Sequence, residues 1–303
     1  MKGKGLISHQ RDQFHRMLIE QRTLAVSSFN KYGEAWIASN ADTGQRTSVL
    51  LSNMLFKKIT TRLNIIPEIF DKKKDGQTAG NEFEAACAWF LNSTFPMLDG
   101  LRPGKWNVEQ VRHRSEAVLG KFEQYSHLSE LSLLAQENKT LRNFLGDGYT
   151  VSPDVIISRK PELDEDINDA TIIVDAESSR NTMLRMENHK DKVRPLLHAS
   201  ISCKFTMRSD RAQNTRTEAL NLLRTRKGRA PHIASVTAEP MSSRIASLAL
   251  GTGDMDYVYH FALYELMECC QELELEESLE LLTTMIDGKR LRDISDLPLD
   301  LAI

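Results

Sequence analysis

The pattern of apolar and polar positions predicts four strands in the second half of the chain. Short apolar runs rich in β-branched residues and bounded by turn residues are typical of buried strands. Such runs lie at residues 153–158, 171–176, 198–206 and 232–238. In residues 198–206 small or apolar residues alternate with polar ones, which places Ser200, Ser202 and Lys204 on one face of the strand.

Apolar residues spaced by three or four positions predict helices before, between and after these strands. The predicted helices cover residues 8–25, 46–63, 80–95, 107–146, 211–225, 257–273 and 276–287. Helices come first and then mix with strands, so we predict an α/β fold with a central mixed β-sheet flanked by helices. The glutamate-rich stretch from Glu265 to Glu280 is expected to face solvent.

Length and composition favour a single elaborated domain over residues 1–303. The chain has 303 residues, of which 41% are hydrophobic and 27% charged, and this is enough to bury a large core. We expect a helical N-terminal part of about residues 1–146 and a catalytic core of about residues 147–303. No apolar run approaches the roughly twenty residues of a membrane helix, and no secretory apolar core follows the charged N-terminus, so we expect a cytoplasmic protein.

The cysteines and two of the histidines are expected to have structural roles. The four cysteines lack the paired spacing of a metal site, so we expect reduced, buried thiols. They are Cys87, Cys203, Cys269 and Cys270. His198 opens a predicted strand and His260 lies in an apolar run, which favours hydrogen bonding within the fold over catalysis.

Candidate chemistry begins at Asp154, which follows Pro153 at the start of a predicted buried strand. A carboxylate there needs a partner or a metal ion, because burying it alone is costly. A turn next to the proline is the competing interpretation. Lys204 lies on the polar face of another predicted strand, where its ammonium can hold an attacking water and offset charge on phosphorus. A solvated surface lysine is the alternative.

Glu218 lies on the helix predicted to follow that strand. Packing of this helix would bring its carboxylate beside Asp154, whereas an exposed ion pair with a neighbouring arginine is the alternative. Two carboxylates from separate elements, completed by phosphate and water, form a typical Mg²⁺ site. Asp154, Lys204 and Glu218 together therefore indicate Mg²⁺-dependent hydrolysis of a phosphodiester.

A basic cluster opens the same helix. In the major groove arginines can bind guanine O6 and N7, and an aspartate can accept from cytosine N4. Arg208, Asp210 and Arg211 would therefore suit G·C pairs, while a charged helix start with an internal salt bridge is an equal interpretation. Residues 204–229 hold eight Lys or Arg against Asp210 and Glu218, in a chain of formal net charge −3. This local excess favours DNA contact on one face.

The chain resembles the NgoMIV-type type II restriction endonucleases, which cut around a CCGG core. The motifs that carry the resemblance are Pro153-Asp154, Ser202-Cys203-Lys204, Arg208-Ser209-Asp210-Arg211 and Glu218. They are similar to that family's variant of the PD-(D/E)XK site, in which the second acidic ligand lies on the following helix and Ser202 takes the usual acidic position. Further similar segments are residues 76–78, 80–85, 106–108, 125–128, 237–240 and 293–301. The first forty residues and residues 161–194 match poorly.

This resemblance implies a restriction-endonuclease-like α/β/α fold and a set of site residues. The catalytic residues that it implies are Glu84, Asp154, Ser202, Lys204 and Glu218. Metal ligands would be Asp154, Glu218 and the main-chain carbonyl of Cys203. The implied DNA contacts are Gln77 in the minor groove, Arg208, Ser209, Asp210 and Arg211 at the CCGG core, and Arg244 at the outer base pair.

The resemblance also implies an activity and an assembly. The reaction would be Mg²⁺-dependent hydrolysis of double-stranded DNA at GCCGGC, cut after the first G to leave four-nucleotide 5′ overhangs. A palindromic site calls for a two-fold symmetric protein, and the family implies a homotetramer of two dimers and a cognate DNA methyltransferase in the same cell. Two alternatives remain: a structure-specific or repair nuclease with the same core, and a non-cleaving DNA-binding module. The joint presence of the carboxylates and Lys204 counts against the second.

Overall fold

A six-stranded sheet forms the centre of the computed structural model, which describes residues 3–112, 117–138, 153–190, 192–207, 209–251 and 253–303. The strands follow one another in the order β4-β5-β6-β7-β8-β9. Their bounds are β4 Trp106–Gln110, β5 Val155–Arg159, β6 Leu196–Lys204, β7 His232–Thr237, β8 Tyr257–His260 and β9 Leu291–Asp293. The pairs from β4 to β6 are antiparallel, whereas those from β6 to β9 are parallel. The predicted central mixed sheet is confirmed.

Strand register brings three strand ends to one edge of this sheet. Val155 at the start of β5 pairs with Ile201 of the antiparallel β6, so Asp154 lies beside the last residues of β6. The parallel register then places Lys204 opposite Thr237, where β7 ends. The sequence segments around Asp154, Lys204 and Thr237 are therefore neighbours in space.

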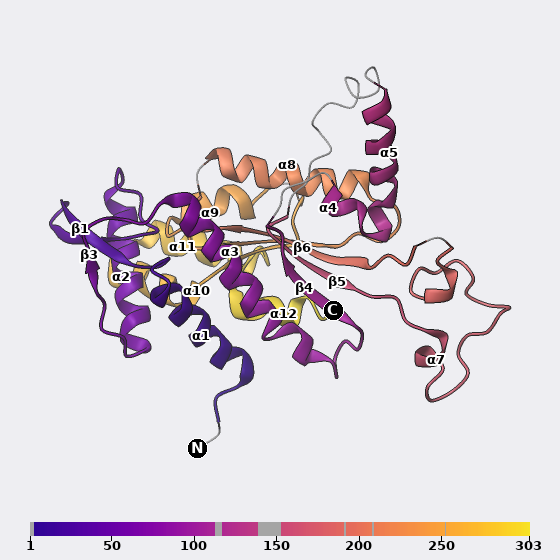
Figure 1. Ribbon diagram of the computed structural model, residues 1–303. Coiled ribbons are helices and arrows are strands. Elements are labelled where there is room, and N and C mark those ends of the chain that lie inside the picture. Colours follow the sequence, from indigo (N-terminus) through magenta and orange to yellow (C-terminus); the bar gives the residue numbers. More distant parts are fainter. Residues whose placement is uncertain (1–2, 113–116, 139–152, 191, 208, 252) are drawn as a thin grey trace.

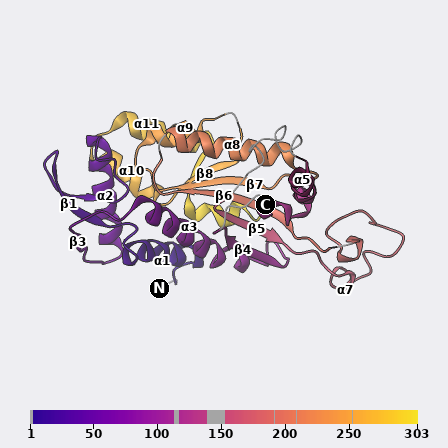
Figure 2. The same ribbon diagram turned by 45° about the horizontal axis from the view of Figure 1, so that its top comes forward.

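Helices cover both faces of the sheet, as predicted. α8, α9 and α11 lie on one side, and α1 and α3 lie on the other (Figure 1, Figure 2). The longer helices are α1 Leu6–Glu20, α2 Arg46–Arg62, α3 Gly76–Asn92, α5 Ser126–Glu137, α8 Ser209–Thr225, α9 Ser242–Ala249, α10 Leu263–Glu272 and α11 Glu276–Asp287. The short helices are α4 Ala117–Gly120, α7 Asp164–Ile167 and α12 Leu297–Asp300, with 3-10 turns η1 Phe95–Leu98, η2 Glu123–Tyr125, η3 Met186–Asn188 and η4 Ile294–Asp296.

Local sequence accounts for the two helices that pack nearest the site. α3 begins after Asp75, whose carboxylate accepts hydrogen bonds from the amides of Gln77 at 3.1 Å and Thr78 at 3.0 Å. These bonds satisfy amides that a helix start otherwise leaves without partners. α8 buries Ala219 and Leu222, three residues apart, and so presents one apolar stripe to the sheet.

A smaller three-stranded sheet lies at one end of the molecule, with α2 against it (Figure 1). Its strands are β2 Glu34–Ala38, β1 Val26–Lys31 and β3 Ile69–Phe70, in that order. Asn53 of α2 accepts from the amide of Ala38 at 2.9 Å and donates to the carbonyl of Trp36 at 2.9 Å. This side chain fixes the helix to the edge of the small sheet. The sequence pattern did not predict these three strands.

Two predicted helices are wrong in part. Residues 106–110 form β4 instead of a helix because they pair along their length with β5. In the described part of this segment, α-helix returns in α4 and α5. Residues 139–146 of that prediction lie outside the described residues. The predicted helix 257–273 is β8 followed by α10. The aromatic and β-branched start of that segment favours a strand, and the strand and the helix follow so closely that one helical pattern covered both.

The strand predicted at residues 171–176 is also wrong. This segment is irregular, with bends at its two ends, and Ile172 in it is 82% exposed. The side-chain oxygen of Asn168 accepts from the amides of Ile173 at 2.8 Å and Val174 at 2.9 Å. A side chain thus takes the amides that a neighbouring strand would have bonded. The segment belongs to an excursion that carries α7 away from the body of the protein (Figure 1, Figure 2).

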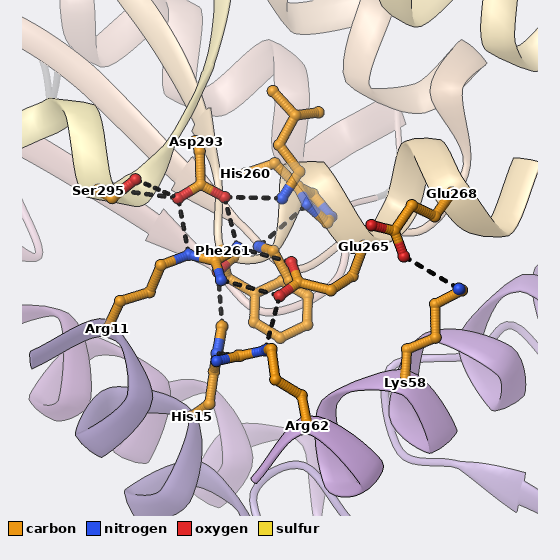
Figure 3. Close-up of polar contacts among 12 residues, drawn as sticks. Arg11, His15, Lys58, Arg62, His260, Phe261, Glu265, Glu268, Asp293 and Ser295 are labelled. Atoms are coloured by element: carbon orange, nitrogen blue, oxygen red, sulfur yellow. Dashed lines mark hydrogen bonds and ion pairs between the residues drawn. The ribbon is translucent and has the colours of Figure 1, made fainter. Parts of the chain in front are cut away.

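A buried ion network ties the first helix to the C-terminal part of the chain (Figure 3). Arg11 donates to Glu265 at 2.8 and 2.6 Å and to Asp293 at 2.8 Å twice. Burial alone would raise the pKa of Glu265, but the hydrogen bonds and charge of Arg11 lower that pKa to about 2. The expectation that the glutamate-rich stretch faces solvent is therefore wrong at Glu265, although Glu268 and Glu272 are exposed.

The predicted structural roles of the histidines and cysteines are confirmed. His198 forms a 2.8 Å hydrogen bond with the carbonyl of Leu301, and His260 accepts from the amide of Ala262 at 3.2 Å. Burial lowers the pKa of His198 to about 3 and that of His260 to about 4. All four cysteines are buried free thiols. Within the described ranges, no helix has both the length and the apolar character needed to cross a membrane.

Candidate active site

Asp154 is a buried carboxylate at the sheet edge where β5 begins. Its side chain is 2% exposed, and its Oδ2 atom accepts hydrogen bonds from three successive residues of β6. The donors are the hydroxyl of Ser202 at 3.3 Å, the amide of Cys203 at 2.7 Å and the ammonium of Lys204 at 2.7 Å. Charge-assisted bonds of this kind offset the cost of burying the carboxylate.

The backbone of Lys204 is held by the neighbouring strand β7. Its carbonyl accepts from the hydroxyl of Thr237 at 2.8 Å and from the amide of Ala238 at 3.3 Å. The lysine side chain is 17% exposed, so the ammonium is paired with Asp154 and still reaches solvent. This arrangement gives the ammonium one defined position at the sheet edge.

Glu218 comes to the same edge from the helix above the sheet. It lines a small cavity between α8 and the sheet, together with Pro153, Ser200, Ser202 and Thr215. Ser200 and Ser202 line this cavity because alternate residues of a strand face the same side. The structure therefore places Glu218 and the residue next to Asp154 around one cavity.

Cys203 faces the opposite side of β6, where α3 packs, and Glu84 is a residue of α3. The Cys203 thiol is hydrogen-bonded with Cys87, and burial raises its pKa far above the usual value. The negative charges of Asp154 and Glu84 add to this rise in pKa. A thiol in such surroundings is a poor nucleophile. Cys203 therefore contributes its main chain, not its thiol, to the neighbourhood of Asp154.

The donor set around this edge suits a hard divalent cation. Asp154 and Glu218 supply carboxylate oxygens and Ser202 supplies a hydroxyl oxygen, which are ligand types that Mg²⁺ prefers. Across the ranges that the structure describes, no three His, Cys, Asp or Glu side chains cluster to form a metal site by themselves. Mg²⁺ usually takes one or two carboxylates and completes its shell with water and phosphate.

Arg244 lies in the first turn of α9, apart from the Asp154 cluster. Its guanidinium forms an ion pair with Asp42, lies 3.6 Å from Glu239 and is 3.4 Å from the carbonyl of Met207. Gln77 is exposed at the start of α3, with its amide on the Asp75 cap. The structure thus holds Arg244 in a charged network and leaves the Gln77 side chain at the surface.

The predicted base-reading cluster falls largely outside the described part of the chain. Arg208 is not among the described residues. Ser209, Asp210 and Arg211 form the first turn of α8, and the description does not extend to their side chains. The position of this turn is known from its neighbours: Met207 precedes it, and Met207 lies beside Arg244.

Sequence reasoning gave no role to Glu239 or Asp42, the two carboxylates around Arg244. Glu239 is fully buried two residues after the end of β7, and Asp42 lies four residues after the end of β2 in the small sheet. A sequence signal existed for Glu239, because a carboxylate so close to the end of a buried strand needs a partner. Asp42 gave no such signal, since it meets Arg244 only through the tertiary fold.

Two sequence comparisons with known proteins agree on one family. The family model described as NgoMIV restriction enzyme matches residues 14–303. The type II restriction enzyme NgoMIV from Neisseria gonorrhoeae is 47% identical over 298 residues, covering 98% of this chain and 99% of that protein. A crystal structure of the type IIF restriction endonuclease Bse634I with cognate DNA aligns with 84% of this chain and 97% of that chain, at a TM-score of 0.41 and 13% identity.

Proposed function

Since this chain belongs to the NgoMIV restriction enzyme family and is a type II restriction endonuclease, we propose that it cuts double-stranded DNA at GCCGGC in a Mg²⁺-dependent reaction. The cut falls after the first G and leaves four-nucleotide 5′ overhangs. The main support within the fold is the convergence of Ser202, Cys203 and Lys204 on one oxygen of Asp154. Glu218 beside the same strand supplies a second carboxylate.

Each residue of the site then has a defined task. Asp154, Glu218 and the carbonyl of Cys203 hold Mg²⁺, which supplies positive charge to the scissile phosphate and the leaving oxygen. Lys204, fixed by its 2.7 Å pair with Asp154, orients the attacking water and offsets charge that develops on phosphorus.

The two remaining residues act at the margins of the site. Ser202 donates to Asp154 and so keeps that carboxylate oriented toward the sheet edge. Glu84, whose charge reaches the Cys203 thiol from α3, supports the water shell of the ion from the other side of the strand.

DNA reading is assigned to residues on α8, α9 and α3. Arg208, Asp210 and Arg211, with Ser209, read the G·C pairs of the CCGG core through the major groove. Arg244 reads the outer base pair. This assignment is supported by the position of its guanidinium, which lies 3.4 Å from the carbonyl of Met207. Met207 lies just before the first turn of α8, which we call the base-reading turn. Gln77 contacts the minor groove from the exposed start of α3.

A palindromic site also defines the proposed assembly. Each half-site is read by one subunit of a two-fold dimer, and two such dimers form a homotetramer that binds two sites. A cognate DNA methyltransferase in the same cell protects the host copies of GCCGGC. We therefore propose that the enzyme acts in the cytoplasm, where host DNA and this methyltransferase are located.

Sequencing the ends of digested DNA tests this proposal. A set of sequenced plasmids is digested with the purified protein and Mg²⁺, and the fragment ends are sequenced. We expect every cut at GCCGGC with a four-nucleotide 5′ overhang. The Asp154→Ala variant should bind GCCGGC without cutting, whereas Glu277→Ala, which removes an exposed carboxylate of α11, should cut like the wild type.

Other outcomes would replace parts of the proposal. Cuts at other sites that contain CCGG would remove the assigned role of Arg244. Cutting governed by ends, nicks or mismatches would favour a repair nuclease, and specific binding without any cutting would favour a DNA-binding module. Mg²⁺-dependent cutting by Asp154→Ala would overturn the metal assignment.

A further inference from the structure

Glu239 is a buried carboxylate that the proposed reaction does not use. It lies two residues after the end of β7 and is fully shielded from solvent. Burial raises its pKa, while the amide of Met207 and the charge of Arg244 oppose this rise. A carboxylate is rarely fully buried unless it is paired or hydrogen-bonded, because its desolvation is costly.

The contacts of Glu239 lead to both parts of the DNA-reading apparatus. One carboxylate oxygen accepts from the amide of Met207 at 2.8 Å. The other accepts from the amide of Met241 at 3.2 Å and lies 3.6 Å from the guanidinium of Arg244. Met207 directly precedes Arg208. One side chain therefore fixes the backbone that enters the base-reading turn and the side chain assigned to the outer base pair.

The segment that carries Glu239, residues 237–239, also contacts the catalytic strand β6. The hydroxyl of Thr237 donates to the carbonyl of Lys204 at 2.8 Å and accepts from the amide of Glu239 at 3.1 Å. Residues 237–239 thus hold the chain at Lys204 and again at Met207. The short segment between catalytic lysine and base-reading turn is fixed at both ends by β7 and its extension.

We propose that Glu239 is a positioning residue for sequence reading, which orients Arg244 toward the outer base pair and fixes the entry to the base-reading turn. This inference rests on the proposed function. A carboxylate beside a guanidinium restricts the directions in which its N–H groups can point. Base discrimination depends on such placement, because a loosely held donor accepts more than one base.

Cleavage of two duplexes by four proteins tests the proposal. The duplexes carry GCCGGC and ACCGGT, which share the core and differ in the outer pair. The proteins are the wild type, Glu239→Gln, Arg244→Ala and the double variant, and the readout is the ratio of single-turnover rates on the two duplexes. We expect Glu239→Gln to reduce the preference for GCCGGC by roughly tenfold, as loss of a directed base contact does.

The double variant separates positioning from general damage to the fold. If Glu239 acts through Arg244, the double variant loses no more preference than Arg244→Ala alone. Glu265→Gln is the matched control, because Glu265 is also a buried carboxylate paired with an arginine, Arg11. It should lower the unfolding midpoint and leave the rate ratio unchanged. Additive losses in the double variant, or an equal change of ratio in Glu265→Gln, would overturn the proposal.

Failure of the inference differs from failure of the proposed function. A wild type that prefers GCCGGC, together with a Glu239→Gln variant of unchanged preference, would overturn the positioning role alone. A wild type that cuts both duplexes at one rate would remove outer-pair reading by Arg244, and the role of Glu239 with it. The rate ratio of the wild type therefore decides which of the two statements has failed.

Discussion

The Arg11 cluster and the Asp154 cluster both bury carboxylates beside cations, yet they differ in their access to solvent. In the Arg11 cluster, Glu265 and Asp293 face the guanidinium of Arg11 (Figure 3). A second guanidinium, that of Arg62, lies 3.1 Å from Glu265. The side chains of Arg11, Glu265 and Asp293 are each at most 9% exposed, so these paired charges are closed off from solvent.

The Asp154 cluster, in contrast, is partly open to solvent. Lys204 supplies the ammonium that pairs with Asp154, while Glu218 reaches the same edge from α8 and Glu84 approaches β6 from α3. The Lys204 side chain is 17% exposed, so this edge is within reach of ions from solution. The comparison teaches that the first cluster holds the fold together, whereas the second is suited to receive a metal ion and a phosphate.

Removal of Arg11 is expected to give the largest change in stability. Arg11→Ala leaves Glu265 and Asp293 buried without their main partner, so the free energy of unfolding should fall by about 3–5 kcal/mol. Urea unfolding followed by circular dichroism measures this loss. Lys58→Ala, which breaks the more exposed pairs with Glu268 and Glu272, is the control and should change stability by less than about 1 kcal/mol. A loss that small for Arg11→Ala would contradict the structural role of the cluster.

Acid should weaken the Arg11 region gradually, by less per pH unit than the Arg11 substitution does. Burial lowers the pKa of His15 to about 3 and that of His260 to about 4. In the unfolded chain both histidines have a pKa of about 6.5, so below this pH the unfolded chain binds more protons than the folded chain. As the pH is lowered below about 6.5, the free energy of unfolding should therefore decrease by about 1.4 kcal/mol per pH unit for each of these histidines. The stabilisation by Glu265, whose pKa is lowered to about 2, is lost only below its unfolded value of about 4.5.

The window between pH 6.5 and pH 4.5 therefore reports on the histidines. Urea midpoints at several pH values across this window measure the slope, and His260→Gln should make it shallower than in the wild type. A stability that stays constant across the window would show that these histidines are not buried in neutral form.

The local part of the site could be predicted from sequence, and its distant parts could not. Ser202 and Lys204 lie two positions apart on one strand, so the strand period places them on one face. Pro153 marks the start of the strand that carries Asp154. In contrast, Glu239 meets Met207 only because β7 runs beside β6. Contacts between residues far apart in sequence leave no periodic signal.

The fold shows the same division between local and distant information. The pattern of residues 276–287 predicts α11 with its observed bounds. The strand β4 was taken for helix because its pairing with β5 decides its conformation. Glu265 was expected at the surface because its partner Arg11 lies 254 residues away. The positions of Glu84 and Gln77 in the proposed site came from the family resemblance alone.

The dependence of cleavage on Mg²⁺ tests most directly whether the Asp154 cluster is built for a cation. Single-turnover cleavage of a GCCGGC duplex is measured over a Mg²⁺ titration for the wild type, Glu218→Gln and Glu265→Gln. We expect Glu218→Gln to need at least about tenfold more Mg²⁺ for its half-maximal rate, and Glu265→Gln to follow the wild-type curve. If Glu218→Gln has the same Mg²⁺ dependence as the wild type, Glu218 does not hold the ion and the contrast between the two clusters fails.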